Sequence, residues 1–246
     1  MTARVARTQG YRYVGQPGRV PSRYIFTCEH ASNTVNHHPV TPSDQTLLSQ
    51  HWGWDIGAAA LVEVLCEKTC AIGVLGTESR LVIDVNRHPD SDTLIVPSCE
   101  GIPVSFNQNI TPEDLELRLD IFNDFHGGLR SAIQRQSGLG VHRLVSIHSF
   151  TPVWQGVPRD IEVGVLFDRY TAEAQRIAQA LQTQGVKAGL NVPYSGMIGE
   201  LMYSATMHGD EHHLPYLEFE IRQDLLTTEQ DIEKMAQCLV TALEVF

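Results

Sequence analysis

Short apolar runs rich in β-forming residues alternate along the chain with longer helical stretches, and this alternation restricts the fold most strongly. Strands that alternate with helices form α/β folds, in which a largely parallel sheet is buried between helices. No linker-like segment follows residue 22, so we expect one α/β domain over residues 23–246, preceded by an irregular arm over residues 1–22. The predicted strands cover residues 24–28, 70–75, 80–85, 143–148, 162–167, 187–192 and 216–222.

The helix starts carry recognisable capping sequences. Thr111 is followed by proline and two acidic residues, which predicts a helix from there to about Gln136. Ser43 is a candidate cap for a helix that runs to about Lys68. Two further helices are predicted over residues 171–184 and 228–246, and a long Pro-containing loop, a candidate site element, over residues 88–110.

Composition excludes several classes of protein. The 246 residues include 18 Lys and Arg against 29 Asp and Glu, and the resulting net charge of −11 argues against a nucleic-acid partner, because phosphate binding needs a basic surface. No apolar run approaches the ~20 residues that a membrane span needs, so no membrane partner is expected. The five cysteines form no C-x-x-C pair, and residues 1–13 lack the apolar segment of a secretory signal. We therefore expect a reducing, cytoplasmic setting.

Polar residues at the ends of buried strands are the most informative candidates for chemistry. Ligands of open α/β sheets bind outside the carboxyl ends of the strands, and buried polar groups need partners, so we expect these side chains to meet. Two histidines and a carboxylate make a catalytic zinc site, and a further carboxylate can act as base toward the bound water. A single such histidine more often only caps a strand, whereas the whole set favours a site. The set consists of Glu29, His30, His148, Glu218, Glu220 and Arg222.

Two further clusters leave alternatives open. Alternation places Arg80 and Asp84 on one face of a predicted strand, either as a structural ion pair or as part of an anion clamp. Asp55 lies beside two tryptophans and two glycines in the predicted helix. Three roles stay open for it: a metal ligand, a residue that supports a metal ligand, or an ordinary helix acid. The adjacent pairs His37-His38 and His212-His213 are expected at the solvated surface.

The order and spacing of several motifs resemble those of N-formylglutamate amidohydrolases, over about residues 24–245. This family is related in fold to zinc carboxypeptidases and aspartoacylases, and it hydrolyses N-formylglutamate to formate and glutamate late in histidine breakdown. The resemblance implies one three-layer α/β domain with a mixed, mostly parallel sheet and one Zn²⁺ per chain. The motifs are Cys28-Glu29-His30-Ala31-Ser32-Asn33, Trp54-Asp55-Ile56-Gly57, Arg80-Leu81-Val82-Ile83-Asp84-Val85-Asn86-Arg87, His148-Ser149 and Glu220-Ile221-Arg222-Gln223-Asp224-Leu225.

The resemblance also implies a metal site and a catalytic base. His30 and His148 correspond to zinc ligands. Zinc carboxypeptidases have a glutamate three residues after the first ligand, where this chain has Asn33. Because the resembling family also has an acidic residue in the corresponding helix, Asp55 is the first choice for the third ligand, with Glu29 as the alternative. Glu220 aligns with the general base of the carboxypeptidase-like enzymes.

Further residues are implied to bind the substrate, a small acidic N-acyl amino acid. Arg80 and Arg87 are candidates to hold its carboxylates, and Arg87 is also a candidate to stabilise the developing oxyanion. Arg222, Asn33 and His126 are further candidates, with packing as the alternative for His126. N-formylglutamate is the substrate implied most directly. Another N-acyl amino acid or small peptide is the alternative, and a non-catalytic binding protein that retains the fold is a reading of a different class.

Overall fold

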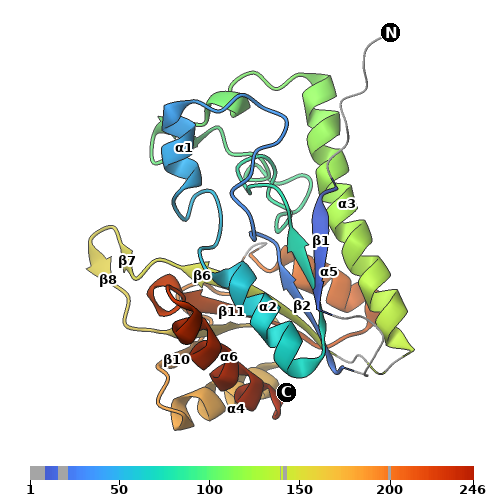
Figure 1. The fold of residues 1–246 in the computed structure, drawn as a ribbon, viewed down its shortest axis with the longest axis vertical. Coiled ribbons are helices and arrows are strands. Elements are labelled where there is room, and N and C mark those ends of the chain that lie inside the picture. Colours follow the sequence, from blue (N-terminus) through green and yellow to red (C-terminus); the bar gives the residue numbers. More distant parts are fainter. Residues whose placement is uncertain (1–8, 16–21, 139, 141–142, 199–200) are drawn as a thin grey trace.

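The computed structural model describes residues 9–15, 22–138, 140, 143–198 and 201–246. In these residues a seven-stranded sheet lies between helices, which confirms the predicted α/β fold with a mixed, mostly parallel sheet (Figure 1). The strands follow the order β1-β3-β2-β6-β11-β9-β10 across the sheet. Their bounds are Tyr11–Gly15 for β1, Tyr24–Cys28 for β2, Ile72–Gly76 for β3, Arg143–Phe150 for β6, Val163–Leu166 for β9, Ala188–Leu190 for β10 and Tyr216–Arg222 for β11.

The centre of the sheet is parallel. Strands β3, β2, β6 and β11 run in one direction, so their carboxyl ends meet at one edge of the sheet. Strands β1 and β9 pair antiparallel with β3 and β11, and β10 pairs parallel with β9. Two small hairpins lie outside the sheet, β4 (Ser98–Cys99) with β5 (Ile102–Pro103) and β7 (Val153–Trp154) with β8 (Val157–Pro158).

Helices cover both faces of the sheet. Helices α2 (Ala58–Thr69), α4 (Thr171–Thr183) and α6 (Glu229–Leu243) pack on one face, and α3 (Pro112–Ser137) and α5 (Tyr203–His212) on the other (Figure 1). Strand alternation divides the side chains between two cores, so Leu217 and Phe219 of β11 join the first and Tyr216 joins the second. A short helix, α1 (Pro42–Leu48), and two 3₁₀ turns, Ser105–Asn107 and Gln223–Leu225, complete the fold. Among the described residues, no helix has the length and apolarity to cross a membrane.

Helix α3 and one buried arginine hold the long loop before it. Thr111 caps α3 as predicted, and its hydroxyl accepts a hydrogen bond from the Asp114 amide. Arg118 of α3 is fully buried and donates to the carbonyl oxygens of Val82 and Phe106 at 2.8 and 2.7 Å. Because these bonds satisfy backbone groups that no strand partner reaches, they fix the path of an otherwise irregular segment.

Four expectations for local structure were wrong. The predicted helix from Ser43 to Lys68 is two helices, α1 and α2, separated by residues 49–57. Residues 80–85 form turns with local hydrogen bonds, such as the Val82 amide to the Ser79 carbonyl, and not a strand. The arm predicted as irregular contains β1 at residues 11–15, while residues 1–8 and 16–21 lie outside the described part. His38 and His212 are not at the solvated surface, because His38 pairs with Asp114 at 2.6 Å and His212 packs in α5.

Gly57 explains why the first predicted helix breaks. Its φ of +84° lies in the left-handed region, and a Cβ there would meet the Leu226 Cβ at 2.4 Å. A side chain at this position would therefore meet both backbone strain and a clash. The break allows residues 49–57 to turn toward the edge of the sheet, where Asp55 is needed.

We expect Gly57→Ala to destabilise the protein by about 1–2 kcal/mol from backbone strain, plus about 1–3 kcal/mol from overpacking. Gly185→Ala is the matched control, since Gly185 has the same φ of +84° and open space around its Cβ position. Urea unfolding of both variants measures the difference. Equal losses of stability would mean that contact with Leu226 does not restrict this position.

Candidate active site

Strand alternation creates a polar strip on the face of the sheet that α3 and α5 cover. In the register between β11 and β6, Glu218 lies opposite Ser146 and Glu220 lies opposite His148. Glu29 follows β2 on the other side of β6 and accepts a hydrogen bond from the Ser146 hydroxyl at 2.7 Å. All five side chains are buried near the carboxyl ends of parallel strands. The sequence prediction that strand-end polar residues meet is confirmed for Glu29, His148, Glu218 and Glu220.

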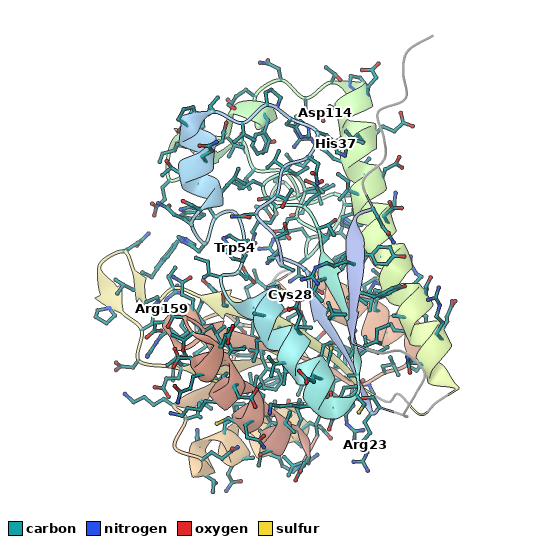
Figure 2. The ribbon with its side chains drawn as sticks, in the orientation of Figure 1. Arg23, Cys28, His37, Trp54, Asp114 and Arg159 are labelled. Atoms are coloured by element: carbon teal, nitrogen blue, oxygen red, sulfur yellow. The ribbon has the colours of Figure 1, made fainter. Side chains whose placement is uncertain are left out.

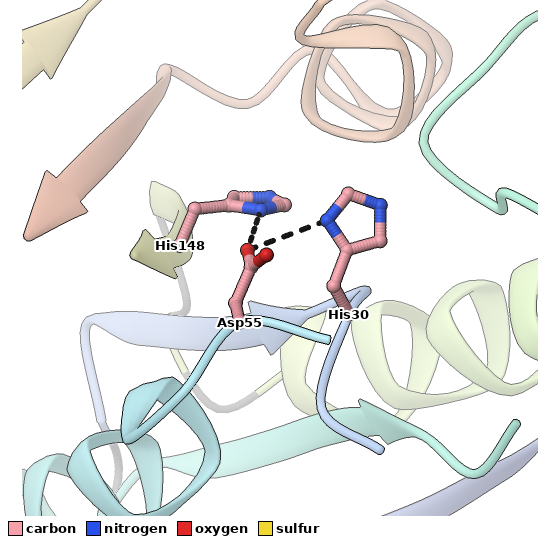
Figure 3. Close-up of side chains that lie close together, drawn as sticks. All are labelled: His30, Asp55 and His148. Carbon is pink, nitrogen blue, oxygen red and sulfur yellow. Dashed lines mark hydrogen bonds and ion pairs between the residues drawn. The ribbon is translucent and has the colours of Figure 1, made fainter. Parts of the chain in front are cut away.

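One carboxylate oxygen brings the two strand-end histidines together. Asp55 Oδ2 lies 2.6 Å from His148 Nδ1 and 3.3 Å from His30 Nδ1 (Figure 3). The backbone amide of Asp55 donates to the carbonyl of His30 at 2.9 Å, which anchors the segment between α1 and α2 to the end of β2. One ligand atom from each of the three buried residues lies within 4.8 Å of the others, so the group could hold a metal ion.

The second ring nitrogen of each histidine also faces a carboxylate. His30 Nε2 lies 2.7 Å from Asp84 Oδ1, and His148 Nε2 lies 3.2 Å from Glu29 Oε2. Outer carboxylates of this kind orient the histidines of metal sites and raise their basicity. Two imidazoles and one carboxylate are also the donors of many catalytic zinc sites. The residues present therefore fit a divalent metal ion, with Asp55 and not Glu29 grouped with the histidines.

The buried carboxylates divide into two electrostatic classes. Burial would raise the pKa of Glu29, but hydrogen bonds from His148 and Ser146 lower it to about 2. In the same way Arg80 and His30 outweigh burial and hold the pKa of Asp84 well below its ordinary value. The two classes differ in whether a cationic or hydrogen-bonding partner lies close enough to offset burial.

The glutamates of β11 belong to the other class. Burial raises the pKa of Glu218 to about 7 and the pKa of Glu220 well above its ordinary value. Glu220 Oε2 is buried and has no hydrogen-bond partner among the described residues. Carboxyl groups with raised pKa values in a cleft are characteristic of acid–base catalysts.

A cavity of about 310 Å³ opens above this group. Its polar side consists of His30, Asp55, Asp84, Asn86, His148, Ser149, Glu218 and Glu220. Its lining also includes five aromatic side chains, those of His51, Trp52, Phe150, Trp154 and Tyr194. The cavity therefore combines an ionisable end with a surface suited to apolar or planar groups.

Two of the predicted arginines line the cavity. Arg80 Nη2 donates to Asp84 at 2.7 Å, and Arg80 Nη1 lies 3.7 Å from Asp55. The structural pair with Asp84 is confirmed, and because Arg80 also lines the cavity, its role in an anion clamp stays a prediction. Arg87 lines the cavity and donates to the carbonyl of Asn86 at 2.8 Å.

The structure does not bring the other predicted substrate contacts to the cavity. Asn33 is exposed, and Arg222, at the end of β11, pairs with Asp224 at 2.8 Å and does not line the cavity. His126 lies in α3 with its Nδ1 2.9 Å from Nε2 of His208. Burial lowers the pKa of His126 to about 4 and the pKa of His208 to about 2, so the two rings form a neutral buried pair.

Sequence reasoning missed Arg159 entirely. This residue follows the β7–β8 hairpin (Figure 2), and its guanidinium carbon lies 5.3–5.4 Å from the ring centroids of Phe150, Trp154 and Tyr194, all of which line the cavity. Within the described residues, Arg159 forms no ion pair. Only the folded hairpin brings these rings around the guanidinium, so no local pattern marks it. Asn86 was also missed as a site residue; its side chain accepts from the Ser204 amide and donates to the carbonyl of Leu201.

Comparison with known proteins identifies what the chain is similar to. Residues 22–227 match the family model described as N-formylglutamate amidohydrolase, a range that includes every residue lining the cavity. The crystal structure of a gene product from Agrobacterium tumefaciens is 26% identical, with a TM-score of 0.86 over 97% of this chain and 95% of that one. The N-formylglutamate amidohydrolase from Ralstonia eutropha JMP134 shares the fold at 15% identity, with a TM-score of 0.74 and 97% of each chain covered. Among curated proteins, no sequence matches.

The two glutamate classes predict opposite effects of amide substitution on the stability of metal-free protein. The folded-state pKa of Glu220 is raised, so this group lowers stability as pH rises above the ordinary glutamate pKa. Glu220→Gln removes that cost and should raise the unfolding free energy by about 1–3 kcal/mol at about pH 8, and by less at about pH 5. Urea unfolding at the two pH values measures this.

Glu29→Gln is the matched control and should be destabilising. The pKa of Glu29, about 2, lies below the ordinary glutamate value. The native side chain therefore contributes to the free energy of unfolding at both pH values, and this contribution is lost only as pH falls toward that pKa. Destabilisation of equal size in both variants would contradict the division into two classes.

Proposed function

Because the chain belongs to the N-formylglutamate amidohydrolase family, we propose that it hydrolyses the acyl amide bond of a small acidic N-acyl amino acid, most directly N-formylglutamate to formate and glutamate. The observation that carries the proposal is the buried group of His30, Asp55 and His148 beside Glu220, in one cavity inside the matched range. A metal site beside an unpartnered carboxyl group supplies the Lewis acid and the general base that metal-dependent amide hydrolysis uses.

His30, Asp55 and His148 would hold the metal ion, for which Zn²⁺ is the proposed identity. When bound, such an ion lowers the pKa of water and polarises a carbonyl group. Asp84 and Glu29 contact Nε2 of His30 and of His148, respectively, and so orient the two rings. Arg80 holds Asp84 in its ionised form and so supports the orientation of His30.

Glu220 is proposed as the general base. It lines the cavity opposite His148 in the sheet register, and its free Oε2 is available to accept a proton from the attacking water. Burial favours its protonated form, so the same group can return the proton to the leaving amine. Arg87, which faces the cavity, is proposed to stabilise negative charge that develops on the carbonyl oxygen.

Positive charge for the substrate carboxylates must come from local arginines, because the chain carries a net charge of −11. Arg80 is already engaged with Asp84 and Asp55. Arg159 forms no ion pair among the described residues, and three rings of the cavity wall hold its guanidinium in place. A preorganised and unpaired guanidinium is suited to binding a carboxylate in bidentate geometry. We therefore add Arg159 to Arg80 and Arg87 as a proposed substrate contact.

The aromatic wall favours a second candidate within the same reaction class. Trp52 and Trp154, whose ring centroids lie 5.8 Å apart, offer more apolar surface than a formyl group and a glutamate side chain use. Another N-acyl amino acid or a small peptide with an apolar group would contact that wall. Assays of N-formylglutamate beside a panel of acyl amino acids distinguish the two substrates. A protein that binds these compounds without turnover, even with metal present, would be a non-catalytic member of the fold.

Replacement of the base should separate turnover from metal binding. We expect Glu220→Gln to lower kcat by about 10²–10⁴-fold while bound zinc stays at the wild-type level, because the carboxylate acts on the proton and is not in the metal group. His148→Ala should instead lose both zinc and activity. Glu162→Gln, outside the cavity, is the control. Steady-state kinetics and metal analysis of the purified variants test this, and wild-type kcat in Glu220→Gln would refute the base assignment.

Replacement of the aromatic-held arginine should affect substrate binding. We expect Arg159→Met to raise KM for N-formylglutamate about 10–100-fold with little change in kcat, since a charge-assisted hydrogen bond is lost. The same variant should act normally on an N-formyl amino-acid amide that lacks the carboxylate. Arg176→Met, at an exposed arginine that lies outside the cavity and pairs with Glu173, is the matched control. An equal rise in KM for both substrates would indicate damage to the cavity wall and not loss of a carboxylate contact.

A further inference from the structure

The last turn of α5 carries a second group of metal-capable side chains. His208, Glu211 and His212 each offer one ligand atom, and these atoms lie within 4.8 Å of one another. Residues three and four apart share one face of a helix, which is why the group forms. The His208 and His212 rings are nearly parallel, with 3° between their planes and 6.3 Å between centroids. None of the three lines the cavity of the candidate active site.

One imidazole nitrogen of each histidine in this group lacks a hydrogen-bond partner among the described residues. His208 is fully buried, and its Nδ1 has no hydrogen-bond partner among the described residues. The same is true of Nε2 of His212, although that residue lies nearer the surface. Buried polar atoms in folded proteins are nearly always paired with protein, water or an ion, because leaving them unpaired is costly. These two nitrogens therefore point to an additional bound species.

His126 prepares His208 as a ligand. Its Nδ1 lies 2.9 Å from Nε2 of His208, so the two rings share one hydrogen. When His208 donates that hydrogen from Nε2, its Nδ1 keeps a free lone pair, which is the form that binds a metal. A hydrogen bond from the second ring nitrogen is the usual support of a ligand histidine.

The charges around the group also suit a cation. Both oxygens of Glu211 lie 2.9 Å from Nε of Arg130 in α3, which orients the carboxylate and leaves further lone pairs free. The group lies at the carboxyl end of α5, where the helix dipole presents partial negative charge. Two imidazoles and one carboxylate match zinc and its neighbours among the divalent transition metals, whereas calcium and magnesium prefer oxygen ligands alone.

We propose that His208, Glu211 and His212 form a second metal site, which binds a divalent transition-metal ion such as Zn²⁺ and joins the end of α5 to α3. The connection to α3 runs through Arg130 and His126. Helix α5 also reaches the active site, because the Ser204 amide donates to Asn86. An ion at the far end of α5 would therefore stabilise the helix that supports one wall of the catalytic cavity.

Zinc titration of the chelator-treated full chain by calorimetry tests the proposal. Wild-type protein should show two classes of site. His212 and Glu211 lie at the less buried side of the group. His212→Ala and Glu211→Gln should each weaken zinc affinity at the α5 site by at least about tenfold and preserve hydrolase activity. His148→Ala should abolish zinc binding at the candidate active site and preserve zinc binding at the α5 site. His213→Asn is the control, since it removes the neighbouring exposed imidazole at a position with φ of 54° that asparagine tolerates.

A cobalt titration of His148→Ala protein provides an independent readout. Its visible absorption should rise with one equivalent of Co²⁺, and the added Glu211→Gln substitution should abolish the rise. A single class of zinc site in the wild type would overturn the proposal, as would two classes that persist in the His212→Ala variant. Hydrolase activity in the His212→Ala variant establishes that the protein is folded when the titration is made.

Discussion

The contact of one carboxylate oxygen with two histidines organises the active centre. Asp55 Oδ2 faces Nδ1 of both His30 and His148, which come from strands separated by more than a hundred residues of sequence. The contact requires Asp55 to reach the edge of the sheet from a segment that is neither helix nor strand. Gly57, which has a left-handed φ and no room for a side chain, ends that segment and starts α2. The placement of the proposed metal group thus depends on a backbone position that only glycine fills without strain.

The site concentrates negative charge that its surroundings only partly offset. Five carboxylates are buried around the cavity, and the basic residues near them are Arg80, Arg87 and the two histidines. Arg80 and the histidines keep Asp55 and Asp84 ionised, whereas burial leaves Glu218 and Glu220 inclined to hold a proton. A bound cation would relieve this imbalance and favour the carboxylate form of Glu220. Such a region is less stable without its metal than an apolar core, which is a common cost of function.

Sequence patterns predicted the sheet and the strand-end residues well because both follow local rules. The β6 and β11 strands alternate core residues with polar ones, so periodicity places His148 and Glu220 on a polar face, and the register of the two neighbouring strands sets them opposite each other. Alternation misled at residues 80–85, where Arg118 from α3, and not a neighbouring strand, satisfies the Val82 carbonyl. The position of Arg159 depends on a hairpin folding over three aromatic rings. Contacts between distant elements of that kind leave no periodic trace in the sequence.

Arg80, which lines the cavity, and Arg159, which packs against three rings of its wall, have different tasks that follow from their partners. Arg80 cannot be withdrawn from Asp84 without raising the pKa of that carboxyl and loosening the support of His30. The positive charge of Arg80 is therefore largely used to stabilise the ionised form of Asp84. Arg159 is held by π faces that leave its hydrogen-bond donors weakly used, with contacts to Thr151 and Tyr194 of 3.4–3.5 Å. An acidic protein can thus bind an acidic substrate if one cation maintains the catalytic group and another, otherwise unpaired, meets the substrate.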